Sequence, residues 1–532
     1  MVREPGPAST GTGPAASLPD MQVPLTTADF LYRAEQVYPD RIGVVDEPNQ
    51  PAGSLGELTY GEIAVRARAI AAGLDALGVG EGERVAVVSE NSARLLELLL
   101  GVTAYGRVCV PINFRLQAAE IEYIVEHCGA SVLLVDPEHD ERLSHLSAKH
   151  RFVLGEDYDT GLLVHDVEPA PWAEPDENAT ATINYTSGTT ARPKGVQITH
   201  RNIWTNATTF GWHMGVNESD VYLHTLPMFH CNGWGMLYAA AGMGVKQIVL
   251  RKVDGAEILR LVQQHDITYA CGAPAVWNMV LDAAADWDGE VPGRGRMRVI
   301  VAGAPPPTRT VVRLQSEIGW TFNQIYGLTE TSPLLTVNRM RSEWEELPAD
   351  EQASRLTRAG VPALGCRVSI SESGEVLVRS NTVLAGYWQQ PEVTADALED
   401  GWFHTGDGGV IDEDNYLVIS DRKKDVIITG GENVSSIEVE DALFSHPAVA
   451  EAAVIGVPDD RWGETIKGLV VLAPGEQASE ADLIAWCKER LARYKAPTSI
   501  EVREAIPRTA TGKIQKFKLR ESYWEGRERQ IG

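Results

Sequence analysis

Residues 185–196 have the sequence Tyr-Thr-Ser-Gly-Thr-Thr-Ala-Arg-Pro-Lys-Gly-Val, which combines hydroxyl groups, backbone amides and an ammonium group. The hydroxyl-rich part consists of Thr186, Ser187, Gly188, Thr189 and Thr190. Lys194 adds a cation, and the segments 181–185 and 195–199 on either side are predicted strands. A loop of this kind, fixed between two strands, is suited to hold a polyanion such as a triphosphate. It is not a Walker A loop, because that spacing is absent and no helix follows directly. A solvated turn is the alternative, but such a turn has no need of the lysine.

A second candidate is the segment 224–235, which contains two histidines and a cysteine. A metal site is disfavoured, because His230 and Cys231 are adjacent and no third ligand has suitable spacing. An ordinary histidine of the core or of a loop is the default interpretation. The alternative is that His230 and Trp234 line an apolar cavity.

Residues 323–331, Asn-Gln-Ile-Tyr-Gly-Leu-Thr-Glu-Thr, offer several groups that suit a nucleotide. Tyr326 has an aromatic face for a base, and Gly327 permits close approach of the backbone. Thr329 and Glu330 are suited to phosphate and to a hard metal ion. Alone the motif is weak, because a glycine turn before a helix cap gives the same pattern.

Two further residues gain meaning only in combination with these motifs. Asp407 follows a glycine turn and could accept hydrogen bonds from both ribose hydroxyls, although any turn favours Gly-Asp. Lys513 lies in the loop Pro-Arg-Thr-Ala-Thr-Gly-Lys near the C-terminus. A lone surface lysine is normally solvated, so Lys513 matters only if the C-terminal region closes over the phosphate loop.

The composition bounds the kind of protein that carries these motifs. The chain has 532 residues, 44% of them hydrophobic, and a formal charge of −27, which disfavours nucleic acid and anionic membranes as partners. The six cysteines are far apart without a CxxC pair, so neither a disulfide framework nor a zinc site is expected. We expect no secretory signal and no transmembrane segment. These features favour a cytoplasmic protein.

The elements that must position the motifs alternate between strands and helices. Predicted strands at 84–88, 131–136, 244–250, 267–275 and 297–302 alternate with helical patterns such as 63–77 and 93–105, which indicates α/β architecture with largely parallel sheets. Short strands between glycine and aspartate turns predict a small β-rich subdomain around 365–420. After the charged cluster 421–425, an α+β unit is predicted, with helices at 436–444 and 480–494 and strands at 449–456 and 466–472.

Taken together, the motifs resemble those of the adenylate-forming acyl-CoA synthetases. Their order is YTSGTTxxPKG, LPMFH, YGLTE, TGD, DRKKD, GGENVSSIEVE and PRTATGK, and the resemblance extends from about residue 26 to residue 519. It implies a large α/β N-terminal domain, a hinge and a mobile C-terminal domain. The predicted division is a flexible tail at 1–22, an N-terminal domain at 23–422, a hinge at 423–425 and a C-terminal domain at 426–532.

The resemblance also assigns roles to individual residues. Thr186, Ser187, Gly188, Thr189, Thr190 and Lys194 would form the phosphate loop. Gly303, Ala304 and Pro305 would flank the adenine on one side, with Gln324, Ile325 and Tyr326 on the other. Thr329 would contact phosphate, Glu330 would hold Mg²⁺, Asp407 would bind the ribose and Arg422 would face the nucleotide. Lys513 would be the catalytic lysine of adenylation, Lys424 the hinge, and Gly430, Gly431 and Glu432 part of the loop of the second half-reaction. His230 would gate the acyl pocket, whose wall Asn232, Gly233 and Trp234 would shape, with Gly327 beside it.

The implied reaction joins a carboxylic acid to ATP, releases pyrophosphate and transfers the acyl group from the adenylate to coenzyme A. The family branch suggested by the HCNGW run activates short- to medium-chain, branched or aromatic acids, and glycines at 235, 242 and 244 leave room for a cyclic acid. No cation is evident among the pocket positions, which disfavours amino acids and dicarboxylates.

Three points stay open at the level of sequence. Ala191 stands where the family usually has glycine, and a small change in loop mobility is expected. The acceptor could be a carrier protein instead of coenzyme A, and a nucleotide-binding regulator without turnover is the alternative from another class. Oligomeric state is not readable, with a homodimer as one option.

Overall fold

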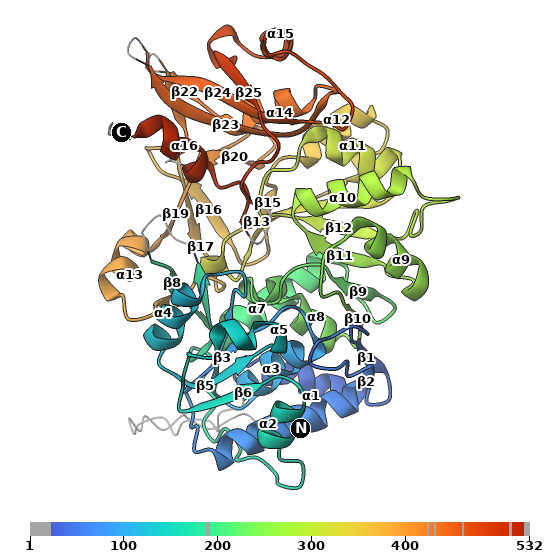
Figure 1. The fold of residues 1–532 in the computed structure, drawn as a ribbon, viewed down its shortest axis with the longest axis vertical. Helices are drawn as coiled ribbons and strands as arrows, with labels where there is room; N and C mark the ends of the chain where they lie inside the picture. The colour runs from blue at the N-terminus through green and yellow to red at the C-terminus, as the bar shows by residue number, and fades with distance from the viewer. Residues whose placement is uncertain are drawn as a thin grey trace, which may run out of the picture.

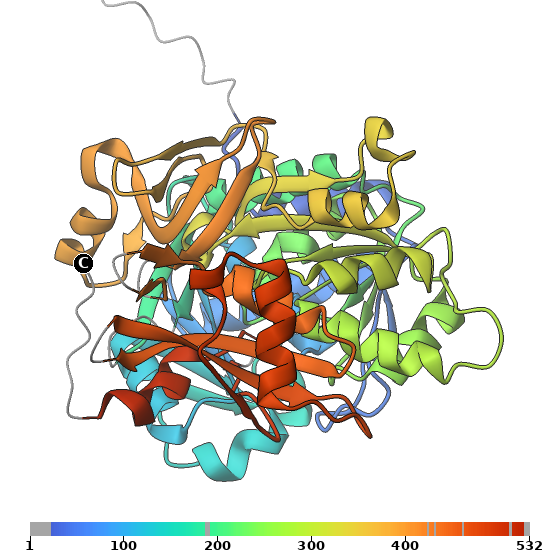
Figure 2. The same cartoon turned by 90° about the horizontal axis from the view of Figure 1, so that it is seen from above.

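The computed structural model describes residues 23–186, 192–422, 425–429, 432–459, 462–509 and 513–525. Figure 1 shows a large lower part, coloured blue to orange, and a smaller C-terminal unit in orange and red at the top. Figure 2, seen from above, shows that the C-terminal unit lies over the large part, beside its β-rich subdomain.

The first sheet of the large part carries the predicted phosphate loop. Its strand order is β18-β8-β7-β4-β3-β5-β6. The bounds are β3 (Arg84–Val88), β4 (Val108–Ile112), β5 (Ala130–Val135), β6 (His150–Val153), β7 (Thr180–Thr186), β8 (Lys194–Thr199) and β18 (Gly386–Tyr387). The neighbouring strands β6, β5, β3, β4 and β7 pair in parallel. Strands β7 and β8 form an antiparallel hairpin whose connection is the predicted loop.

The second sheet brings together the segments expected to surround the nucleotide and the acid. Its order is β15-β14-β13-β12-β11-β9-β10-β1-β2, parallel in the middle and antiparallel at both edges. The bounds are β1 (Ile42–Val45), β2 (Glu57–Thr59), β9 (Val221–His224), β10 (Lys246–Val249), β11 (Tyr269–Gly272), β12 (Arg298–Val301), β13 (Thr321–Gly327), β14 (Leu334–Arg339) and β15 (Val361–Pro362). Buried central strands of this kind are expected to be almost continuously apolar. Strands β9, β11 and β12 have at most one strongly polar residue each, whereas β10 begins with Lys246 and Gln247.

Helices cover the faces of both sheets, as parallel pairing requires. The bounds are α1 (Ala28–Val37), α2 (Tyr60–Ala76), α3 (Ala93–Ala104), α4 (Ala118–Cys128), α5 (Pro137–Asp140), α6 (Glu156–Gly161), α7 (His200–Met214), α8 (Met236–Gly242), α9 (Gly255–His265), α10 (Pro274–Ala285), α11 (Thr308–Ser316), α12 (Ala349–Leu356) and α13 (Pro391–Ala397). Helix α3 is apolar on nearly all sides and is buried along its length, which places it in the interior. Its start is fixed by Ser92, whose side chain accepts a hydrogen bond from the Leu95 amide at 3.1 Å.

Short 3₁₀ segments link several of these elements. They are η1 (Glu141–Leu143), η2 (Cys231–Gly235), η3 (Thr329–Thr331), η4 (Ser342–Trp344), η5 (Glu399–Gly401) and η6 (Arg493–Lys495). Segments η2 and η3 contain the predicted pocket turn and the predicted metal ligand.

The β-rich subdomain and the C-terminal unit complete the chain. The subdomain has the antiparallel order β16-β17-β19-β20, with bounds β16 (Arg367–Ile370), β17 (Glu375–Arg379), β19 (Phe403–Ile411) and β20 (Leu417–Arg422). The C-terminal sheet has the order β22-β21-β24-β23 with β25 paired to β24. Its elements are β21 (Ile427–Thr429), β22 (Glu432–Val434), α14 (Ser436–Phe444), β23 (Val449–Asp459), β24 (Gly463–Leu472), α15 (Glu480–Arg490), β25 (Ser499–Val502) and α16 (Lys516–Trp524).

The predicted fold class is confirmed: a large α/β domain is followed by a small domain of mixed composition. The predicted helix 480–494 was too long, because Leu491 adopts an extended conformation after Arg490. Within the described part of the chain, none of the helices combines the length and the apolar character needed to cross a bilayer.

Candidate active site

The β7–β8 hairpin places the two ends of the predicted phosphate loop opposite each other. Thr186, the last residue of β7, pairs with Lys194, the first residue of β8. Ser187, Gly188, Thr189, Thr190 and the unusual Ala191 lie outside the described residues. The hairpin therefore fixes the ends of the loop by backbone pairing.

Tyr387 joins the cation of this hairpin to the predicted metal ligand. The Lys194 ammonium lies 5.2 Å from the centroid of the Tyr387 ring, and the Tyr387 hydroxyl donates a hydrogen bond to Oε1 of Glu330 at 3.1 Å. Burial and the nearby Glu330 carboxylate raise the pKa of Tyr387, so that its hydroxyl remains a donor at neutral pH. Sequence reasoning missed Tyr387, which reaches this position only because β18 pairs with β8.

Strand β13 leads into the other end of the site. The hydroxyl of Tyr326 donates a hydrogen bond to Oδ2 of Asp407 at 2.8 Å, which connects β13 to β19 of the β-rich subdomain. Asp407 is 7% exposed, and the backbone register pairs it with Arg422 of β20. The structure therefore brings together three residues predicted to face the nucleotide.

The remaining predicted nucleotide residues lie on the same edge of the second sheet. Gln324 and Ile325 are buried in β13, and Thr329 is buried at the start of η3. Ala304 and Pro305 follow β12 in the segment that leads to α11. At Gly327 a Cβ atom would lie 1.5 Å from the carbonyl oxygen of Pro333, so only glycine permits this approach of two backbone segments.

Lys513 reaches the large domain from the C-terminal unit. A side chain added at Gly303, where φ is +90°, would meet Cε of Lys513 at 3.4 Å. Burial and, to a lesser degree, the Lys513 ammonium lower the pKa of His230 to about 3. His230 is therefore neutral at pH 7. Burial and the Glu330 carboxylate raise the pKa of Cys231, which keeps its thiol protonated. Lys513 is thus close enough to His230 to lower its pKa, and Glu330 is close enough to Cys231 to raise the pKa of the thiol.

The residues after His230 form an unusual left-handed turn. Cys231, Asn232 and Trp234 have φ values of 46°, 53° and 59°, and Gly233 and Gly235 are also positive. Left-handed conformations cost about 1–2 kcal/mol for a residue with a Cβ atom, so the surroundings must hold this turn in place. Trp234, 4% exposed, is directed into the protein by it.

A ring of three buried side chains holds this turn against β7. Asn232 Nδ2 donates to Thr182 Oγ1 at 2.9 Å, Thr182 Oγ1 donates to Asn184 Oδ1 at 2.9 Å, and Asn184 Nδ2 donates to Asn232 Oδ1 at 3.2 Å. The Asn206 amide also donates to the Trp234 carbonyl at 3.0 Å. Asn232 was predicted to shape the pocket wall, and its side chain is used to fasten the turn.

Only one of the residues predicted for a second half-reaction and for the hinge is described by the structure. Glu432 is exposed on β22 of the C-terminal sheet. Gly430 and Gly431 of the same loop, and the predicted hinge Lys424, lie outside the described residues.

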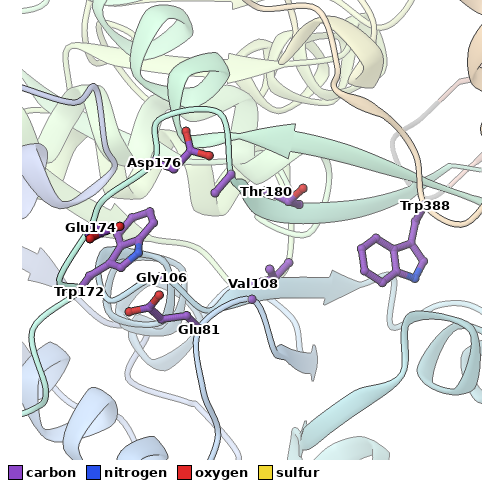
Figure 3. Close-up of a pocket in the computed structure, with 10 residues that line it drawn as sticks. Glu81, Gly106, Val108, Trp172, Glu174, Asp176, Thr180 and Trp388 are labelled. Atoms are coloured by element: carbon purple, nitrogen blue, oxygen red, sulfur yellow. The ribbon is translucent and has the colours of Figure 1, made fainter.

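Two other features within the described ranges do not belong to the site. Glu90, Asp136 and Glu138 have the spacing of metal ligands, but the Arg251 guanidinium pairs with all three at 3.0, 2.9 and 2.7 Å. The cavity in Figure 3, of about 390 Å³, is lined by acidic residues and by tryptophans of surrounding segments, and none of the predicted site residues lines it.

Comparisons with known proteins show which family the chain is similar to. Residues 31–388 match the family model of the AMP-binding enzymes, and residues 438–513 match the model of the AMP-binding enzyme C-terminal domain. A probable acyl-activating enzyme of Arabidopsis thaliana, named as peroxisomal, is 36% identical over 94% of this chain and 96% of its own. A 2-methylpropanoate–CoA ligase of Humulus lupulus is also 36% identical over 94% of this chain and 96% of its own. Because the Arabidopsis relative is peroxisomal, the cytoplasmic location stays a prediction.

Solved structures show the same fold in a ligand-bound relative. The o-succinylbenzoate CoA synthetase of Bacillus subtilis, in complex with its acyl-adenylate intermediate, has a TM-score of 0.79 and 28% identity over 92% of this chain and 97% of that chain. The same synthetase with ATP and a magnesium ion has a TM-score of 0.77 and 27% identity over 92% of this chain and 99% of that chain.

Proposed function

The chain belongs to the AMP-binding enzyme family and is an AMP-forming acyl-CoA synthetase, and we propose that the residues gathered around Glu330 and Lys513 carry its adenylation step. In that step an oxygen of the acid's carboxylate attacks the α-phosphorus of ATP, the bond to pyrophosphate breaks, and acyl-AMP is formed. The observation that carries this proposal is the position of Lys513, which extends from the C-terminal unit to Gly303 and His230.

Adenylation needs cations more than it needs a base. A carboxylic acid with a pKa of about 4 is already ionised at neutral pH, so no group has to remove its proton. The difficulty is to bring two anions together and to disperse the charge of the transferring group. Lys513 and Lys194 supply positive charge for this purpose, whereas His230 is neutral because burial lowers its pKa to about 3.

The residues present fit a magnesium ion. Mg²⁺ prefers hard oxygen donors, and the Glu330 carboxylate is such a donor, oriented through Oε1 by the Tyr387 hydroxyl. When bound, the metal ion would neutralise phosphate charge. The chain's own contribution is to hold this carboxylate near Lys194, to which Tyr387 is also packed.

The ribose and adenine would occupy the edge where β13 meets the β-rich subdomain. Asp407 has two carboxylate oxygens, and the hydrogen bond from Tyr326 fixes one of them. A carboxylate held in this way suits a pair of vicinal hydroxyls. The backbone of Gly303 to Pro305 and of Gln324 to Tyr326 would then flank the base, with Arg422 and Thr329 near the phosphates.

The second step transfers the acyl group from the adenylate to the thiol of coenzyme A, with AMP as leaving group. Lys513 serves the first step only, and Glu432 is exposed on β22 of the C-terminal unit. We therefore infer that the C-terminal unit rotates about Lys424 between the steps, which brings the loop containing Gly430, Gly431 and Glu432 to the adenylate.

The acid is proposed to be a small branched or aromatic monocarboxylate. In the predicted pocket wall Trp234 is buried, the Asn232 amide is engaged by Thr182 and Asn184, and the gate His230 is neutral. An amino or a second carboxyl group would lack a partner there. The Humulus relative's name, a ligase for 2-methylpropanoate, supports a branched short acid.

Pyrophosphate release with a panel of carboxylic acids tests these assignments. We expect release with one class of acid, and AMP and thioester once coenzyme A is added. Lys513→Ala should slow adenylation at least a hundredfold. Lys518 is an exposed lysine of α16, and Lys518→Ala should leave the rate of adenylation unchanged. Adenylate without thioester would identify a carrier protein as acceptor, and unchanged release by Lys513→Ala would refute the role of Lys513.

A further inference from the structure

Helix α11 begins next to the segment predicted to flank the adenine, and its N-terminus lacks a cap of its own. The segment runs from Gly303 to Pro307, and α11 follows from Thr308 to Ser316. Pro307 occupies the N-cap position and makes no side-chain cap hydrogen bond. The amides of a first helical turn have no partner within the helix, so they need an acceptor from elsewhere.

The C-terminal unit supplies that acceptor. Oδ1 of Asp441, on α14, accepts a hydrogen bond from the Thr308 amide at 3.0 Å, and Oδ2 accepts one from the Thr308 hydroxyl at 3.2 Å. The next residue, Arg309, donates to the carbonyl oxygen of His446 at 3.4 Å. A carboxylate at a helix N-terminus is favoured both by these charge-assisted hydrogen bonds and by the helix dipole. Asp441 thus caps a helix of the other domain.

The cap at Thr308 and the proposed catalytic lysine contact the two ends of the same segment. Lys513 lies against Gly303 at one end of the segment, and Asp441 binds Thr308 at the other end. Both contacts come from the C-terminal unit, and both are made to the segment expected to flank the adenine. An orientation of the unit that separates Asp441 from Thr308 also moves the loop between β25 and α16 that contains Lys513.

We propose that Asp441 is a positioning residue for adenylation, which fastens the C-terminal unit in the orientation that delivers Lys513. This inference rests on the proposed function, because it assigns the contact between Asp441 and Thr308 to the orientation of the C-terminal unit that serves adenylation. Asp441 does not touch the reacting atoms. It increases the fraction of molecules in which Lys513 is in place, and the contact must break before the second step.

The two half-reactions, measured separately, test the proposal. Asp441→Ala should slow acid-dependent ATP–pyrophosphate exchange about five- to thirtyfold, the range for a lost cap with charged hydrogen bonds. The same variant, given synthetic acyl-AMP and coenzyme A, should form thioester at the wild-type rate or faster. Equal losses in both half-reactions, or unchanged exchange, would overturn the proposal. A wild-type enzyme that forms no thioester from acyl-AMP would instead contradict the proposed second step.

Matched variants separate positioning from general damage. Thr308→Val removes one of the two donors and should slow exchange less than Asp441→Ala. The double variant should be no slower than Asp441→Ala alone, because both changes remove the same contact. Glu489→Ala removes a carboxylate from α15 of the same unit, where its side chain is 73% exposed, and should leave both half-reactions unchanged.

A distance measurement gives a readout independent of turnover. The cysteines within the described residues are all buried, so labels on Ser316→Cys and Lys488→Cys, both exposed, report the distance between α11 and α15. Asp441→Ala should broaden this distance distribution in the presence of ATP. A distribution identical to that of the parent protein would refute a fastening role for Asp441.

Discussion

Replacement of Tyr387 by phenylalanine isolates one hydrogen bond at the centre of the site. The change removes the hydroxyl that donates to Glu330 Oε1 at 3.1 Å, and it keeps the ring that faces the Lys194 ammonium at 5.2 Å. A hydrogen bond to a charged group contributes about 1.5–3 kcal/mol when it is buried. Glu330 is only half-buried, so we take the lower end, about 1.5 kcal/mol, which corresponds to roughly tenfold in kcat/KM for ATP.

The assay is pyrophosphate release at varied ATP and at limiting and saturating Mg²⁺. If the hydroxyl orients the metal-binding carboxylate, the loss should be about tenfold at limiting Mg²⁺ and smaller at saturation, since excess metal compensates for weaker binding. Tyr387→Leu removes the ring as well and should lose a further few-fold from the cation–π contact.

Tyr38→Phe is the matched control for this experiment. It removes a tyrosine–glutamate hydrogen bond of the same length, to Glu218 at 3.1 Å, on an exposed surface. It should have no effect on release. If Tyr387→Phe keeps the wild-type kcat/KM at limiting Mg²⁺, the proposed orientation of Glu330 by Tyr387 is wrong.

Three further predictions concern the scaffold of the site. Thr182→Val breaks the ring that holds the pocket turn through Asn232, and it should raise KM for the acid several-fold with little change for ATP, with Thr182→Ser restoring the wild-type value. Gly327→Ala should abolish soluble, active enzyme, because its Cβ would lie 1.5 Å from the Pro333 carbonyl oxygen; an active, well-folded variant would contradict this. Burial lowers the pKa of His224 to about 4 in the folded chain. In the unfolded chain this histidine has the ordinary pKa of about 6.5 and binds a proton at higher pH than the folded chain does. The free energy of unfolding therefore decreases as the pH falls from about 6.5 to 4. This residue should account for about 2 kcal/mol of the loss at pH 5, and denaturant titrations at pH 7 and 5 should show a shallower decline for His224→Asn.

The sequence predicted the bounds of helices and strands whose ends are set by neighbouring residues in the chain. Strand 84–88 and helix 436–444 match the structure because turn residues bound the first and Ser435 caps the second. Helix 480–494 was too long because charged and aromatic residues continue a helical pattern after the backbone has become extended at Leu491. Boundaries set by tertiary packing are not visible in such patterns.

The candidate site divides in the same way. Residues in ordered motifs, such as Glu330 and Asp407, were singled out from the sequence as candidates, and the order of the motifs gave them their expected roles. Tyr387 and Asp441 were missed, since one depends on the pairing of β18 with β8 and the other on the docking of two domains. Tyr387 belongs to none of the quoted motifs, and Asp441 directly follows the GGENVSSIEVE run without being part of it.

The ring of hydrogen bonds among Thr182, Asn184 and Asn232 connects the turn of the predicted acid pocket to the strand that leads into the predicted phosphate loop. Thr182 and Asn184 lie on β7, which ends at Thr186 where the phosphate loop begins, and Asn232 lies in the strained turn that carries Trp234. Adenylation requires the carboxylate and the α-phosphorus to approach within about 3–3.5 Å in a fixed orientation. A turn that costs several kcal/mol to form would relax if it were free, and the acid would lose its register with the triphosphate. Because the ring fastens this turn to the same strand that leads into the predicted phosphate loop, we expect both substrates to be positioned from one rigid element.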